Sequence, residues 1–243
     1  MKKLCTAVFF FCAVCTLFAA DIAEFYDIGF SPDASAYAFA NYGVASQNGA
    51  NQRGYAELFV VDTAKNAYIK EGIYKNGPNA KTANKDGFQT FQDLLSANEK
   101  SFKTFRFPAY SNSVVLYQVA QPKDKSKASP EYKPSVAFRD FSNPVFGRTV
   151  TYSVKVNEFI EGVGANTNSA FCILLEIKSE SGNVLKRYVV GNPQYKRQGV
   201  IAYRLNRVLR DEDGKKLVFV IEKQIAQSDG MSIRFMVETL ALE

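Results

Sequence analysis

Short apolar and β-branched stretches recur along the chain and are separated by turns rich in Gly, Pro, Asn and Asp. This spacing favours β-strands joined by hairpins over long helices. In the first half of the chain it predicts strands at 24–31, 36–45, 55–62, 67–74 and 113–120. In the second half it predicts strands at 147–159, 169–178, 184–190, 199–210, 215–226 and 231–240. The expected fold class is therefore mainly β, with antiparallel hairpins in one or two sheets.

The turns between these strands have a chemical basis. After the first strand, Pro32 presets φ and the Asp33 side chain can bond to its own backbone. Gly-bearing turns at 180–183, 212–214 and 228–230 connect later pairs of strands, and such turns are the strongest short-range hairpin signal. A weak internal similarity links the hairpin at 30–39 with the hairpin at 209–219.

Two of the later strands show how their faces are expected to be covered. The run 217–221 is unbroken apolar, which predicts a central strand covered on both faces. The last strand instead alternates the apolar residues Ile233, Phe235 and Val237 with the charged residues Arg234 and Glu238. It is therefore expected to bury one face and to expose the other to solvent.

One helix of substantial length is predicted, near residues 87–104. Phe88, Phe91, Leu95 and Phe102 fall near one face at helical spacing, with polar residues elsewhere. Because the charges on the polar face are of both signs, we expect this helix to pack on a sheet rather than to bind a membrane.

Residues 1–20 have the layout of a cleavable secretory signal. Lys2 and Lys3 precede an apolar run at 4–18, and the small residues Ala19 and Ala20 follow it. The run is too short to span a bilayer as a helix. An uncleaved N-terminal anchor and a lipid anchor on Cys15 are the two alternatives, and contact with a membrane is expected only if Cys15 is lipidated.

The mature protein is expected to comprise residues 21–243. The segment 121–135 contains three prolines and four lysines and is interpreted as a solvated loop rather than as a lysine patch for anionic lipid or polymer. This segment is also the best boundary between two halves, 21–120 and 136–243, which can share one core.

Composition narrows the classes of function mainly by exclusion. The chain has 30 Lys and Arg against 24 Asp and Glu, and Lys2 and Lys3 belong to the signal, so the mature excess is too small to indicate nucleic-acid binding. Histidine is absent, which excludes Ser-His-Asp and Cys-His catalysis and most zinc sites. A hydrolase would need a pair of carboxylates or a Ser-Lys arrangement. Trp, the best stacking platform for sugars, is also absent, although the 13 Tyr can partly replace it.

No catalytic, cofactor-binding or metal-binding residue is predicted. Cys172, the one cysteine beyond the signal, stands in an apolar run and is expected to be a buried, unreactive thiol. The acidic run 211–213 lacks the ligand spacing of a calcium loop and is interpreted as a hairpin turn. The Gly-containing segment 161–166 is followed by a strand, whereas a phosphate-cradling loop needs a helix there.

Two resemblances carry further expectations. The segment 29–33 running on to 57–62 resembles a blade of the TolB-type β-propellers, over about 35 residues and with a motif of low specificity. The segments 28–33, 56–62 and 232–239 are similar to those of a family of bacterial predicted secreted proteins of unknown function. That resemblance implies export and supplies no activity or site residues.

These observations favour an exported periplasmic or surface protein that binds a protein or polysaccharide partner of the cell envelope through a non-catalytic β scaffold. A carboxylate-dependent exported hydrolase acting on glycans is the first alternative, and it predicts two carboxylates across a cleft flanked by Tyr. A membrane-tethered lipoprotein is the second alternative, and it depends on Cys15.

Overall fold

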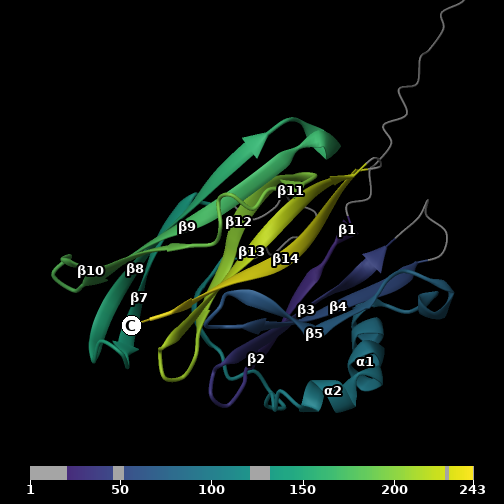
Figure 1. Ribbon diagram of the computed structural model, residues 1–243, viewed down its shortest axis with the longest axis horizontal. Coiled ribbons are helices and arrows are strands. Elements are labelled where there is room, and N and C mark those ends of the chain that lie inside the picture. The colour runs from purple at the N-terminus through teal and green to yellow at the C-terminus, as the bar shows by residue number, and fades with distance from the viewer. Residues whose placement is uncertain (1–20, 46–51, 121–131, 228–229, 243) are drawn as a thin grey trace, which may run out of the picture.

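The computed structural model describes residues 21–45, 52–120, 132–227 and 230–242 (Figure 1). The signal segment 1–20 with Cys15, most of the loop 121–135 and the turn residues 228–229 lie outside the described residues. The described chain folds into antiparallel sheets with two short α-helices, which confirms the predicted mainly β class. Within these residues the strands form three sheets, where the sequence predicted one or two.

The first sheet, here called the N-terminal sheet, is an antiparallel meander. It contains β2 (Glu24–Phe30), β3 (Ala36–Ala45), β4 (Arg53–Asp62) and β5 (Ala67–Asn76), in that order. All four strands were predicted within about two residues of these bounds.

The second sheet, the central sheet, combines strands from both ends of the chain. Its order is β1 (Asp21–Ile22), β14 (Gly230–Ala241), β13 (Lys216–Gln227), β12 (Val200–Arg210) and β6 (Val114–Gln118). The short β1 runs parallel to β14 and covers only Ser232 and Ile233 of its edge. Because β1 and β6 come from the first half of the sequence, this sheet joins the two predicted halves.

The third sheet, the outer sheet, has the order β10 (Val184–Val190), β9 (Asn168–Ser179), β8 (Arg148–Glu161) and β7 (Ser135–Asn143). The short β11 (Arg197–Gln198) also pairs with β9. Strand β7 was not predicted. Its pattern is interrupted by Asp140, which is buried because Arg210 of the central sheet pairs with it.

The three sheets and the helices are stacked in four layers, with the central sheet between the other two sheets (Figure 1). The strand β13 shows this best, because its residues 217–221 are all fully buried. Leu217 and Phe219 pack against the outer sheet, whereas Val218 and Val220 pack against the N-terminal sheet. The prediction of a central strand covered on both faces is confirmed.

The helices cover the far face of the N-terminal sheet. Helix α1 (Gly87–Ala97) begins after Asp86, whose side chain accepts a hydrogen bond from the Gln89 N–H at 2.7 Å. Phe91 and Leu94 bury the apolar face of α1 against the sheet. Asn98 then separates α1 from α2 (Glu99–Lys103), so the helix predicted at 87–104 is two helices. Two short 3-10 helices, Ala80–Thr82 and Gly164–Asn166, complete the described elements.

The turn between β2 and β3 forms as its residues predict. The Asp33 carboxylate accepts hydrogen bonds from the Ser31 and Ser35 hydroxyls at 2.7 and 2.8 Å and from the Ser35 N–H at 3.1 Å. The hydrogen bond from Ser31, followed by those from Ser35, lowers the pKa of Asp33 to about 2. The turn therefore holds an ionised carboxylate at neutral pH.

One expectation about β14 is wrong. Ile233, Phe235 and Val237 lie on a buried face as predicted, where they pack against the N-terminal sheet, but the other face of the strand is not open to solvent. Met236 packs there against the outer sheet, and only 6% of Glu238 is exposed. The segment that connects β10 to β11 lies beside this face, so the charged residues of β14 line a partly open cleft.

Candidate functional site

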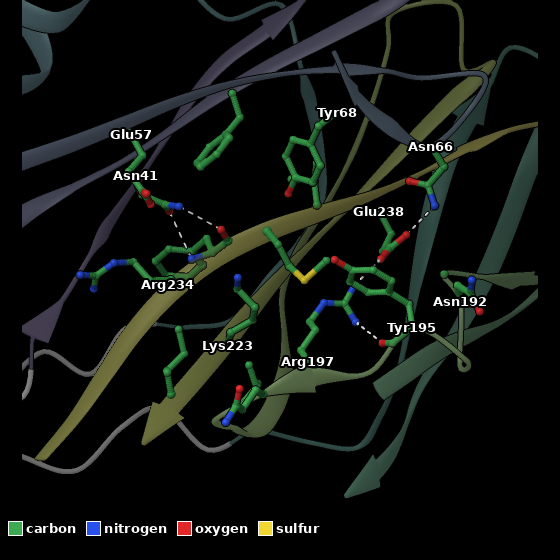
Figure 2. Close-up of a pocket in the computed structure, with 18 of the residues that line it drawn as sticks. Asn41, Glu57, Asn66, Tyr68, Asn192, Tyr195, Arg197, Lys223, Arg234 and Glu238 are labelled. Carbon is green, nitrogen blue, oxygen red and sulfur yellow. Dashed lines mark hydrogen bonds and ion pairs between the residues drawn. The ribbon is translucent and has the colours of Figure 1, made fainter. Parts of the chain in front are cut away.

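A cleft of about 870 Å³ opens where the three sheets meet along the edge of β14 (Figure 2). Strands β4 and β5 and the turn between them form one wall, and the segment 191–198, which connects β10 to β11 of the outer sheet and includes β11, forms the opposite wall. Strands β13 and β14 form the floor. Every wall therefore comes from a different sheet, and the cleft exists only in the assembled fold.

The edge of β14 is hydrogen-bonded by side chains of the N-terminal sheet in place of a neighbouring strand. Asn41 of β3 donates to the Phe235 carbonyl at 2.9 Å and accepts from the Phe235 N–H at 3.2 Å. Four residues further along β14, the Asn66 side-chain oxygen Oδ1 accepts a hydrogen bond from the Thr239 N–H at 2.6 Å. These hydrogen bonds hold the floor of the cleft against its wall. They also satisfy backbone groups of β14 that no neighbouring strand pairs with, which protects this edge from pairing with another chain.

Basic side chains outnumber acidic ones in the cleft. Five basic residues line it, against two carboxylates, which are Glu57 and Glu238. The basic residues come from four separate segments: Lys65, Lys75, Arg197, Lys223 and Arg234. This concentration contrasts with the small charge excess of the whole chain, and it gives the cleft a positive potential that attracts anions.

Most of these cations already have partners. Lys75 forms a 2.8 Å ion pair with Glu57, and Arg234 forms a 2.5 Å ion pair with Asp21. The Arg234 guanidinium also stacks on the Tyr55 ring, 4.3 Å from its centroid. These contacts orient the side chains within the wall and reduce the charge they offer to a ligand.

Lys223 differs because it has no carboxylate within ion-pair distance among the described residues. It lies on β13 between Arg234 and Arg197 (Figure 2). Burial, and next the positive charge of Arg197, lower the pKa of Lys223 to about 8, although Glu57 opposes the shift. At neutral pH the amine is still mostly protonated, so it supplies an incompletely compensated positive charge.

The opposite end of the cleft combines a carboxylate, amides and an aromatic ring. The Asn66 amide donates to one oxygen of Glu238, and the Arg197 guanidinium lies 3.8 Å from the other. Burial raises the pKa of Glu238, while Asn66 and Arg197 act in the opposite direction. The Arg197 guanidinium also stacks on Tyr195, 4.8 Å from the ring centroid. Tyr195 itself is 62% exposed.

Sequence analysis predicted no site residue, and it gave little signal for this cleft. The expectations for three other segments, namely Cys172, the run 211–213 and the segment 161–166, agree with the structure. Cys172 is buried, and burial raises the pKa of its thiol. Asp211 forms the predicted hairpin turn by accepting from the Lys216 N–H at 2.7 Å. The strand β9 follows the Gly-containing segment 161–166.

The charged residues of the cleft were visible in the sequence but could not be assigned to one site. Lys223 follows the apolar run of β13, and Arg234 and Glu238 were interpreted as a solvent-exposed face.

None of the helices in the described parts of the chain is long and apolar enough to cross a membrane.

Comparison with known families adds one result. The model of a family described as predicted secreted protein (DUF2259) matches residues 38–241. The chain belongs to this family. No curated protein matches, and no solved structure matches. Membership supports the predicted export, and the matched range includes every residue that lines the cleft.

Proposed function

We propose that this protein is an exported binding protein that holds an anionic ligand in the cleft along β14. It acts in the periplasm or outside the cell after release of a signal of about residues 1–20. The observation that carries the proposal is Lys223, a protonated and partly buried amine in the cleft, without a carboxylate in ion-pair contact among the described residues. Burying such a charge is costly unless a partner compensates it, and an anionic ligand would do so.

The first prediction concerns the variant Lys223→Met, which removes the charge and keeps most of the side-chain volume. We expect its affinity for citrate and for dextran sulfate to fall by about tenfold or more at low ionic strength, because a charge-assisted contact in the cleft is lost. Calorimetric titration measures both affinities.

The matched control is Lys155→Met, on the exposed side of β8 in the outer sheet, which removes the same charge away from the cleft. It should bind both anions as the unchanged protein does. Equal weakening in the two variants would show that only net charge matters. The proposed function is overturned if the unchanged protein binds neither of these anions and none of the acidic saccharides named below.

The second prediction concerns pH. Lys223 is charged below its pKa of about 8 and neutral above it. An anion binds the charged form better, so affinity should be greatest near about pH 7 and should fall as the pH rises to about 9.5. Titrations with citrate across this range measure the effect. Lys223→Met should bind citrate weakly, and its affinity should hardly change with pH. If its affinity falls with pH as steeply as that of the unchanged protein, the titrating group is not Lys223.

Glycan hydrolysis is a second candidate, favoured by the two carboxylates that line the same cleft. Glu57 forms an ion pair with Lys75, which favours its ionised form. The pKa of Glu238 is raised, as a general acid requires. However, Asn66 and Arg197 both stabilise the ionised form of Glu238, which suits binding better than proton donation. Release of new reducing ends from an acidic glycan, abolished by Glu238→Gln, would favour hydrolysis over binding.

A further inference from the structure

The cleft has two chemically distinct ends (Figure 2). At one end Lys75, Lys223 and Arg234 present positive charge beside Glu57. At the other end Asn66, Asn192 and Glu238 present amide and carboxylate groups near Tyr195, together with the Arg197 guanidinium, which lies between Glu238 and the Tyr195 ring. A ligand that spans both ends is therefore expected to place negative charge opposite Lys223 and hydrogen-bonding groups opposite Glu238 and the amides.

Glu238 indicates what kind of group the second end receives. One of its oxygens accepts from Asn66, and the other lies 3.8 Å from the Arg197 guanidinium, beyond ordinary hydrogen-bond length. This second oxygen lines the cleft and accepts no hydrogen bond from the described residues, so it can accept one from a ligand hydroxyl group. It also disfavours a compact polyanion such as phosphate, whose charge it would repel.

The neighbouring side chains fit a ring that carries hydroxyl groups. Asn192 accepts from the Gln194 N–H at 2.8 Å, which orients its amide and leaves the NH₂ group to donate to a ligand. Arg197 stacks on Tyr195 and holds this exposed ring at the wall of the cleft. A tyrosine ring offers an apolar face together with a polar tip, the combination that the C–H face and hydroxyl groups of a sugar require.

An extended peptide fits less well. A peptide bound as an added strand would need the open edge of β14, because its affinity comes from main-chain hydrogen bonds. The side chains of Asn41 and Asn66 already bond that edge at Phe235 and Thr239.

We propose that the ligand is an acidic saccharide, whose carboxylate pairs with Lys223 and whose adjoining ring lies against Tyr195 with hydroxyl groups bonded to Glu238 and Asn192. This inference rests on the proposed function and narrows its anion to one chemical class. The sequence left a protein and a polysaccharide of the cell envelope open as partners, and this proposal chooses the second.

The test compares three acidic saccharides with matched compounds that each lack one feature. The acidic probes are tetragalacturonate, a hyaluronan tetrasaccharide and sialyl-lactose. The methyl ester of tetragalacturonate keeps the rings without the charge, and citrate keeps carboxylates without a ring. At least one acidic saccharide should bind about tenfold or more tightly than both the methyl ester and citrate.

Two variants locate the two ends. Tyr195→Ala should weaken binding of the acidic saccharide several-fold more than it weakens binding of citrate, whereas Lys223→Met should weaken both. Because Tyr195 is exposed, its replacement should not prevent folding.

The outcomes separate the two proposals. If citrate binds as tightly as every acidic saccharide and still depends on Lys223, the saccharide inference is overturned and the proposed function stands. If neither citrate nor any saccharide binds in a Lys223-dependent way, both are overturned.

Discussion

Replacing Arg210 by Met is expected to destabilise the protein by about 3–5 kcal/mol, the typical cost of leaving a buried charge without its partner. Arg210 of β12 and Asp140 of β7 form an ion pair with an Nε–Oδ2 distance of 3.1 Å. Their side chains are only 9% and 4% exposed. The pair joins the central sheet to the outer sheet. Arg210→Met therefore leaves the Asp140 carboxylate buried between the two sheets without its cation. Urea unfolding measures the loss.

The double variant Arg210→Met, Asp140→Asn is the control for this prediction. It removes the unpaired charge at position 140. It also keeps a side-chain oxygen there that can accept the hydrogen bond which Asn143 donates to Asp140 at 2.9 Å. We expect it to recover most of the stability lost in Arg210→Met, because replacing both members of a buried pair is often nearly neutral. A loss below about 1 kcal/mol in the single variant would contradict the prediction.

The second large effect is expected for Asn41→Ala. Asn41 is 1% exposed, and its amide bonds both the N–H and the carbonyl of Phe235. Its removal leaves both backbone groups of Phe235 without these partners at a buried position. Each such group costs about 1–3 kcal/mol, so the free energy of unfolding should fall by roughly 2–4 kcal/mol. The measurement is again urea unfolding.

Asn192 is the matched control for Asn41, because it is an asparagine that lines the same cleft but lies on the exposed segment 191–198. The variant Asn192→Ala loses one hydrogen bond from the Gln194 N–H and should change stability little, because water can replace that bond. Equal stability of Asn41→Ala and Asn192→Ala would show that the edge of β14 does not depend on Asn41.

Local sequence patterns predicted most strands, because their turns carry their own chemistry. β3 has the predicted bounds of 36–45, since the hydrogen bonds of Asp33 complete the turn before it. β10 likewise has the predicted bounds of 184–190. β7 was missed because Asp140, a charged residue at a buried position, depends on Arg210 seventy residues later. A local pattern contains no information about such a pair.

The cleft could not be predicted for the same reason. Its basic residues lie between positions 65 and 234 and meet only when three sheets stack. The alternation in β14 correctly placed Phe235 in a core, but it could not show that the segment 191–198 lies beside the other face of the strand. Arg234 and Glu238 were therefore interpreted as solvated when they line a site.

Methionine methyl NMR tests the anion-binding cleft most directly. Of the two methionines in the described residues, both on β14, Met236 lines the cleft and Met231 does not. The variants Met236→Leu and Met231→Leu assign the two signals. We expect an anionic ligand, tested first as tetragalacturonate and then as citrate, to shift the Met236 signal in a saturable way, to leave Met231 unchanged, and to lose this effect in Lys223→Met. Binding without a shift at Met236, or equal shifts at both methionines, would contradict a ligand site in this cleft.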